Sequence, residues 1–217
     1  NRGESFLVDI ESAQKDKILS LFDRYIIMDD VEVRDSSEML TTISVIGPRS
    51  VEILNINGIQ VPALEALQFA EVSWRQASII VVRADNPAVA AYDIWLSPEL
   101  APGLIDALTR EGAVPVEAEA VELLRVAAGV PRYGQDFRDR ELPQETNQTR
   151  ALHFTKGCYI GQEIVERIRS RGAVHRSFTG FTIDGNLPEP RTKIQAGGKE
   201  AGEITSAAAL PIATPAG

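Results

Sequence analysis

The sequence predicts an α+β protein built from ferredoxin-like α/β units. Segments with the two-residue period of strands alternate with segments that have the period of helices, and some strands follow one another as hairpins. The chain contains neither the glycine-rich fingerprint of a Rossmann dinucleotide-binding fold nor a phosphate-binding P-loop. Of 217 residues, 44% are hydrophobic and 24% are charged, which is ordinary globular composition.

The first forty residues predict a strand, a helix and a second strand. Residues 6–10 form a short apolar run, and Ser12 is expected to cap a helix that extends to about Tyr25. The apolar stripe of this helix consists of Ile18, Leu19 and Phe22. Val31 and Val33 predict the second strand.

The central region predicts most of a sheet. Residues 39–46 form a strand that ends at Gly47, and Pro48 suits the first turn of a following helix. Further strands are expected at residues 69–73, 78–83 and 91–96.

Two helices follow these strands. Ser97 is expected to cap the first helix, which ends at Gly112. Residues 114–116 predict a short strand, and residues 117–128 predict the second helix. Residues 131–148 are polar and have no period, which is typical of functional or disordered loops. From Ser177 onward, short apolar stretches between glycines and prolines predict a separate all-β module.

The cysteine and histidine content limits the chemistry. Cys158 is the only cysteine, which excludes an internal disulfide and a multi-cysteine metal site and favours a reducing compartment. His153 and His175 are too few and too far apart for a histidine metal site, so no metal site is expected. No apolar run is long enough to cross a membrane, and the start has no initiator Met and no signal sequence. We expect the chain to begin inside a longer one.

The charge of −9 is unevenly distributed. Residues 125–176, which we call the basic segment, contain ten basic and six acidic residues, whereas the remainder contains twelve basic and twenty-five acidic ones. This pattern indicates a local site for an anionic ligand, or else a solvated charged face.

Residues 156–163 carry the most specific chemistry. Gly157 and Gly161 flank Cys158 in a loop ahead of a predicted helix, and Lys156 lies two residues before the thiol. A nearby cation and a helix N-terminus favour a reactive thiolate, so Cys158 and Lys156 are candidate catalytic residues. The alternative is that Cys158 is a small buried hydrophobic residue.

The segment KGCYIGQE, residues 156–163, is similar to the signature of YgfZ-type folate-binding proteins, which are relatives of the glycine cleavage T protein, an aminomethyltransferase. The similarity extends to residues 124–136, 143–147, 167–172 and 202–206. It implies a ring of α/β domains and a C-terminal β-barrel around a tetrahydrofolate or a one-carbon-substituted reduced folate. The resemblance divides the chain into four parts. Residues 1–40 would be the remainder of a first domain, and residues 41–116 a second, ferredoxin-like domain. Residues 117–176 would hold helices and the signature loop that return to the first domain, and residues 177–217 the start of the barrel.

The resemblance also implies ligand-binding residues. Tyr92 and Asp93 look like the tyrosine–carboxylate pair that binds the pterin in the T protein, and a carboxylate can accept the adjacent pterin donors together. Trp74 and Trp95 could stack on the pterin or anchor the core, and the core is the expected place of Trp95, which lies mid-strand. The cofactor-binding residues that we predict are Trp74, Tyr92, Asp93, Arg125, Gln162 and Glu163.

The implied function is that of a folate-binding accessory protein in the maturation or repair of iron–sulfur enzymes, including some that modify tRNA. A tetrahydrofolate-dependent aminomethyltransferase is an alternative. Against it, Val121 replaces an arginine of the T protein, that protein lacks the thiol signature, and its catalytic aspartate has no counterpart here. A third alternative is an RNA-binding module that uses Arg167, Arg169, Arg171 and Arg176, which we expect to bind a folate polyglutamate tail or RNA phosphates. The expected partners are folate, iron–sulfur client proteins and, weakly, tRNA, in the cytoplasm or the mitochondrial matrix and without a membrane.

Overall fold

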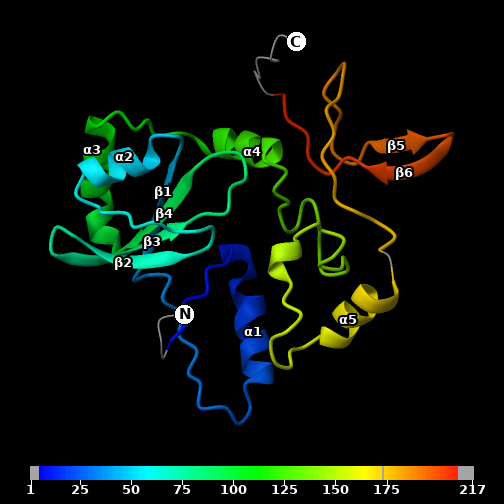
Figure 1. Cartoon of the computed structure of the whole chain (residues 1–217), viewed down its shortest axis with the longest axis horizontal. Coiled ribbons are helices and arrows are strands. Elements are labelled where there is room, and N and C mark those ends of the chain that lie inside the picture. The colour runs from blue at the N-terminus through cyan, green and yellow to red at the C-terminus, as the bar shows by residue number, and fades with distance from the viewer. Residues whose placement is uncertain (1–4, 173, 210–217) are drawn as a thin grey trace.

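The computed structural model describes residues 5–172 and 174–209, except for the side chains of Arg150 and Arg171. It shows a mixed α+β chain in which one sheet unit, on the left of Figure 1, lies beside α1 and a largely irregular second half. The sheet contains β1 (Thr41–Ile46), β2 (Phe69–Trp74), β3 (Ala77–Arg83) and β4 (Ala91–Leu96). These four strands were predicted within a few residues, because β1, β2 and most of β4 show the alternation of a strand with one buried face and β3 is a run of β-branched residues.

The sheet is antiparallel and its strands are ordered β1-β4-β3-β2. One face packs against α2 (Ser50–Ile56) and α3 (Ala101–Arg110), which follows the short 3₁₀ helix η2 (Pro98–Leu100). The residues that form this core include Val45, Leu54, Ile79, Val81, Ile94, Leu96, Leu104 and Leu108. The β2–β3 hairpin turns through Arg75 and Gln76, whose positive φ angles of 48° and 70° match the twist of the strands.

The connectivity departs from the ferredoxin-like pattern. In that pattern a helix precedes the last strand, whereas here residues 84–90 link β3 to β4 without a helix and α3 follows β4. Residues 114–116, predicted as a strand, are irregular, because Pro115 has no N–H to donate to a ladder. The strands predicted at residues 6–10 and 31–33 are also absent from the described structure.

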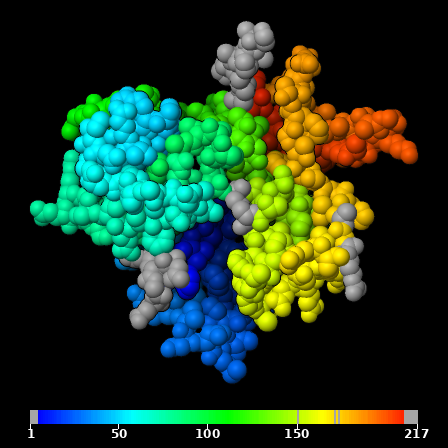
Figure 2. Space-filling view, viewed as in Figure 1, coloured from blue at the N-terminus to red at the C-terminus, as the bar shows by residue number. Residues whose placement is uncertain are grey.

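The N-terminal helix is present but begins differently from the prediction. A 3₁₀ turn, η1 (Ser12–Gln14), leads into α1 (Lys15–Tyr25), and the side chain of Ser12 makes no capping hydrogen bond. In the space-filling view, the blue N-terminal segment and α1 lie between the sheet unit and the yellow residues near 150–170 (Figure 2). Lys17 of α1 donates a hydrogen bond of 3.0 Å to the hydroxyl of Tyr133 and pairs with Asp139, which joins α1 to the irregular segment 131–148.

The second half contains few regular elements. It consists of α4 (Ala118–Ala127), the 3₁₀ turn η3 (Thr149–Ala151), α5 (Gln162–Arg171) and the hairpin of β5 (Lys193–Ala196) and β6 (Lys199–Glu203). Residues 131–148 are irregular, as predicted. The hairpin is the only sheet that the described residues form after Ser177, so the C-terminal barrel stays a prediction. Within the part of the chain that is described, no helix has the length and apolarity to cross a bilayer.

Candidate functional site

Strand β4 separates the two residues of the predicted pterin pair. Neighbouring residues of a strand point to opposite faces of the sheet. Tyr92 lies in the core, 7% exposed, with the Arg83 guanidinium 4.9 Å from its ring centre. Asp93 lies half-buried on the other face, where the hydroxyl of Ser44 on β1 donates a 2.6 Å hydrogen bond to its Oδ1. The structure therefore leaves Asp93 as the candidate ligand residue and makes Tyr92 part of the core.

A second carboxylate, Asp9, belongs to the same region. Partial burial, and after it the negative charge of Asp93, raises the pKa of Asp9, while a hydrogen bond to the backbone of Ile10 opposes the increase. A carboxylate whose pKa is raised by burial and by a nearby negative charge favours a ligand that brings hydrogen-bond donors or positive charge. No sequence pattern indicates this proximity, because the two aspartates are 84 positions apart in the chain.

The two tryptophans occupy the opposite positions from those predicted. Trp74 is 3% exposed within the core, and its Nε1 donates a 3.0 Å hydrogen bond to the carbonyl oxygen of Asn57. This burial removes Trp74 from the candidate ligand site. Trp95 is half-buried on the same face as Asp93, two residues further along β4, and its Nε1 is a buried donor without a partner. A buried donor of this kind is rare and calls for an acceptor.

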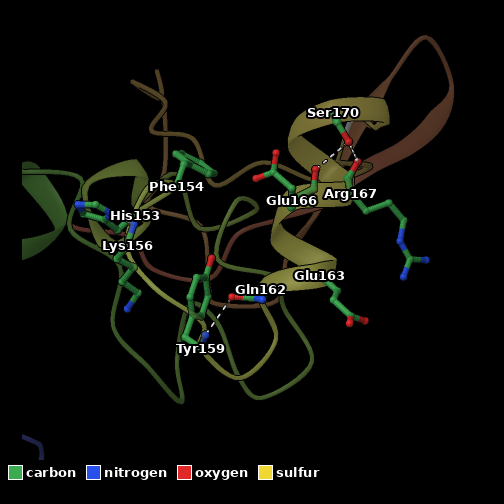
Figure 3. A pocket seen from close by; sticks show the side chains of 9 residues that line it. All are labelled: His153, Phe154, Lys156, Tyr159, Gln162, Glu163, Glu166, Arg167 and Ser170. Atoms are coloured by element: carbon green, nitrogen blue, oxygen red, sulfur yellow. Dashed lines mark hydrogen bonds between the residues drawn. The ribbon is translucent and has the colours of Figure 1, made fainter.

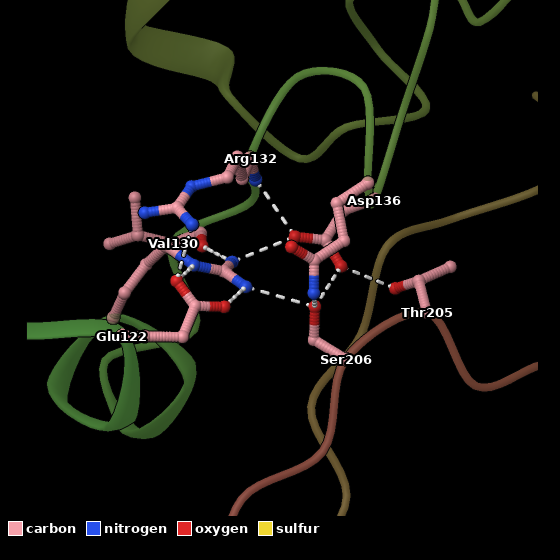
Figure 4. Close-up of polar contacts among 8 residues, drawn as sticks. Glu122, Val130, Arg132, Asp136, Thr205 and Ser206 are labelled. Carbon is pink, nitrogen blue, oxygen red and sulfur yellow. Dashed lines mark hydrogen bonds and ion pairs between the residues drawn. The ribbon is translucent and has the colours of Figure 1, made fainter. Parts of the chain in front are cut away.

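Arg125 is the centre of a different network, in which α4 meets the C-terminal part of the chain (Figure 4). Its Nη1 lies 2.7 Å from Asp136 Oδ2, its Nε and Nη2 both donate to Glu122, and Nη2 also donates to Ser206. Thr205 and Ser206 in turn donate to Asp136 Oδ1. We call this group the Arg125 clasp; it consists of Glu122, Arg125, Asp136, Thr205 and Ser206.

Two carboxylates of the clasp, Asp136 and Glu122, pair with the positive charge of Arg125. Burial would raise the pKa of Asp136, but the hydrogen bonds from Ser206, Thr205 and the Arg132 N–H, together with the Arg125 charge, lower it below its ordinary value. Hydrogen bonds from Arg125 likewise lower the pKa of Glu122. The guanidinium is only 10% exposed and its donors are already used, so Arg125 binds protein groups here and not a ligand.

The predicted thiol segment forms an open loop ahead of α5. Cys158 is exposed, so the alternative of a buried hydrophobic cysteine is wrong. Residues 159–161 separate the thiol from the helix, and the N-cap is Gly161, whose φ of 86° suits glycine. Lys156 Nζ lies 4.5 Å from the ring centre of Tyr159.

This loop and α5 enclose a hollow of about 630 Å³ (Figure 3). The residues that line it are His153, Phe154, Lys156, Tyr159, Gln162, Glu163, Glu166, Arg167 and Ser170. Gln162 uses its Oε1 to accept the Tyr159 N–H at 3.0 Å. Glu163 and Arg167 point outward from the helix. The wall thus carries both charge signs and two aromatic rings, an arrangement suited to an amphipathic ligand.

The structure does not bring all the predicted site residues together. Asp93 belongs to the sheet unit, whereas Lys156, Gln162 and Glu163 lie at α5, on the far side of α1 in Figure 1. Of the predicted arginine cluster, Arg169 stacks on Phe154 at 4.6 Å, and the side chain of Arg171 lies outside the described residues. Among the described side chains, no group of three or more His, Cys, Asp or Glu is placed to hold a metal ion.

Comparison with known families decides the relationship of the chain. The model of the GCVT N-terminal domain matches residues 2–156, more than two thirds of the sequence. The chain belongs to the GCVT N-terminal domain family. An aminomethyltransferase of Rubrobacter xylanophilus is 30% identical over 214 residues, 97% of this chain and 57% of that protein. An aminomethyltransferase of Moorella thermoacetica is 29% identical over 83% of this chain and 51% of that protein.

These relatives place the chain in the glycine cleavage T superfamily, as the sequence indicated. The chain spans about half the length of the curated relatives that it matches. The residues matched to the GCVT N-terminal domain include Asp9, Asp93 and Arg125, and the match ends at Lys156, before Cys158. Asp93 therefore lies inside the matched domain, whereas Cys158 lies outside it.

Proposed function

We propose that this chain forms part of a protein that binds a reduced folate and that Asp93 receives the pterin ring. The observation that carries the proposal is a half-buried carboxylate, oriented by Ser44 at 2.6 Å, on the sheet face opposite the core. A pterin presents a ring N–H and an amino group side by side, and a carboxylate can accept both. Membership in the GCVT N-terminal domain family supports the same assignment.

The residues around Asp93 fit such a ligand. Trp95 has a buried indole N–H without a partner on the same face, and the pterin carbonyl next to the ring N–H would be a matching acceptor. The raised pKa of Asp9 means that this carboxylate holds a proton more readily than an ordinary aspartate does. The wider arrangement that the resemblance implies, α/β domains and a C-terminal barrel around the folate, is part of this proposal.

The reaction that we favour is tetrahydrofolate-dependent aminomethyl transfer. Its support is that the relatives from Rubrobacter xylanophilus and Moorella thermoacetica are named aminomethyltransferases. When bound, tetrahydrofolate accepts the one-carbon unit. In this proposal Asp93 orients the ring, Ser44 fixes one oxygen of that carboxylate, and Asp9 holds or releases a proton beside it.

A second candidate function is the accessory role in iron–sulfur protein maturation or repair, of the YgfZ type. The exposed thiol of Cys158 at the open loop favours it, because transient sulfur or cluster handling needs an accessible thiol. A single thiol would not hold a cluster stably. In this reading the protein acts on iron–sulfur clients, including tRNA-modifying enzymes, in the cytoplasm or the mitochondrial matrix.

Titration of the full-length protein with tetrahydrofolate, followed by calorimetry, tests the folate assignment. Asp93→Asn should weaken binding by about 1.5–3 kcal/mol, which is about 10- to 150-fold, the range for a hydrogen bond to a charged group. Asp106→Asn is the matched control, because Asp106 is an exposed aspartate on α3, outside the candidate site. Equal affinity of the Asp93→Asn and control proteins would remove Asp93 from the ligand site.

Cys158→Ala separates the two candidate functions. Because Cys158 is exposed and makes few contacts, the change should leave folding and folate binding intact. An aminomethyltransferase would keep its activity in this variant, as measured by tetrahydrofolate-dependent release of ammonia from an aminomethyl donor. The accessory role instead predicts that the variant fails to restore iron–sulfur enzyme activity in cells that lack the protein, and full restoration would contradict that role.

A further inference from the structure

Side chains hold both ends of the loop that carries Cys158. At its start, His153 Nδ1 accepts hydrogen bonds from the backbone N–H of Lys156 at 2.9 Å and of Thr155 at 3.3 Å. At its end, Gln162 Oε1 accepts the N–H of Tyr159 at 3.0 Å. Residues 156–159, which we call the thiol loop, are therefore held at each end by a neighbouring side chain, and the Lys156 ammonium lies over the Tyr159 ring.

The two anchors differ in their chemistry. An imidazole nitrogen can accept a hydrogen bond only through its lone pair, so His153 must be neutral and must carry its proton on Nε2. An imidazolium has a hydrogen on both nitrogens, and it would repel the two N–H groups that Nδ1 now accepts. The amide of Gln162 does not titrate. Of the two anchoring side chains, only His153 can therefore change its protonation state.

We propose that His153 is a proton-sensitive positioning residue for the thiol loop. In its neutral form it fixes the backbone on which Lys156 and Cys158 are presented, and protonation releases that end of the loop. The charged groups that line the same hollow are Lys156 of the loop and Glu163, Glu166 and Arg167 of α5. This inference goes beyond folate binding and does not depend on Asp93, so the two proposals fail separately.

The protonation state of His153 can be read directly in the unmodified protein. The chain has two histidines, and the exposed His175 serves as the internal control. The ¹⁵N shifts of the imidazole rings distinguish the two neutral tautomers. We expect His153 at about pH 8 to be predominantly the Nε2–H form and His175 to be a mixture. A His153 ring protonated on Nδ1, or one with the same mixture as His175, would overturn the proposal.

Thiol reactivity tests the effect on Cys158, and it reports on that residue alone because there is no other cysteine. The probe is a dipyridyl disulfide, which reacts with thiols in mildly acidic solution. His153→Asn places an amide oxygen where Nδ1 lies and does not titrate. His153→Gln moves the amide to the place of Nε2 and removes the acceptor. Circular dichroism of each variant verifies that it is folded.

At about pH 8 we expect the wild type to react like His153→Asn and to differ from His153→Gln by about threefold or more. At about pH 5.5 the wild-type rate should move away from that of His153→Asn toward that of His153→Gln. Equal rates of all three proteins at both pH values, or a wild type that follows His153→Asn throughout, would refute the positioning role. The tautomer measurement decides the question by itself if His153→Gln does not fold.

Discussion

Asp136→Asn should strongly destabilise the chain. The Asp136 side chain is fully buried and accepts hydrogen bonds from Arg125, Thr205, Ser206 and the backbone of Arg132. Asparagine has nearly the same shape but keeps only one acceptor oxygen, and its NH₂ group would face donors. The substitution therefore isolates the charge and hydrogen bonding of the clasp from its packing.

The magnitude follows from those contacts. Removing one partner of a buried ion pair costs about 3–5 kcal/mol, and each lost hydrogen bond to a charged group costs about 1.5–3 kcal/mol. Two features reduce the loss: Arg125 stays paired with Glu122, and asparagine keeps some of the hydrogen bonds. We expect the free energy of unfolding to fall by about 2–4 kcal/mol at pH 7, measured by urea denaturation and circular dichroism. Asp139→Asn, an exposed change in the same loop, should have little effect because surface ion pairs contribute little.

The pH dependence gives an independent check. The pKa values of Asp136 and Glu122 are lower in the folded protein than in the unfolded chain. These carboxylates therefore make their full contribution to the free energy of unfolding above the ordinary carboxylate pKa. It is lost as the pH falls through the lowered values, because protons then bind both states. The difference between wild type and Asp136→Asn should therefore shrink below about pH 4. A loss under about 1 kcal/mol at pH 7, or a difference that stays constant into acid, would refute the reasoning.

Three further predictions concern Asp9 and the two tryptophans of the sheet. Asp9→Asn should raise the free energy of unfolding slightly at pH 7, because the raised pKa of Asp9 means that the fold disfavours its charge. The gain should vanish in acid, where Asp9 is protonated in both the folded and the unfolded state. Urea titrations at both pH values measure the difference, and a loss of stability at pH 7 would contradict the prediction. Trp74→Phe should cost about 1–2 kcal/mol of stability, because it leaves the Asn57 carbonyl without its donor, yet it should not change folate affinity. Trp95→Phe should do the reverse, weakening folate binding with little change in stability, because its indole N–H has no partner in the protein.

Much of the fold was predictable because its signals are local. Strands β1, β2 and most of β4 alternate between more and less buried residues, and β3 is a run of β-branched residues, so the local sequence sets each strand without help from distant residues. The predictions of short strands at residues 6–10, 31–33 and 114–116 were wrong. A few apolar residues are compatible with a strand, but they do not ensure that a partner strand is present. The order of the strands across the sheet, β1-β4-β3-β2, likewise depends on pairing that no local pattern specifies.

The sequence by itself determined most elements of the sheet unit, the loop ahead of α5 and the glycine cleavage T superfamily, since these signals are read in order along the chain. Only the tertiary structure decided which side chains meet. It placed Trp74 in the core and Trp95 beside Asp93, because α2 and α3 cover one face of the sheet and a strand's alternation does not say which face that is. It also brought Arg125 into hydrogen-bond contact with Ser206, 81 positions away in the chain. A buried guanidinium needs hydrogen-bond partners, and these can come from segments that are distant in the sequence.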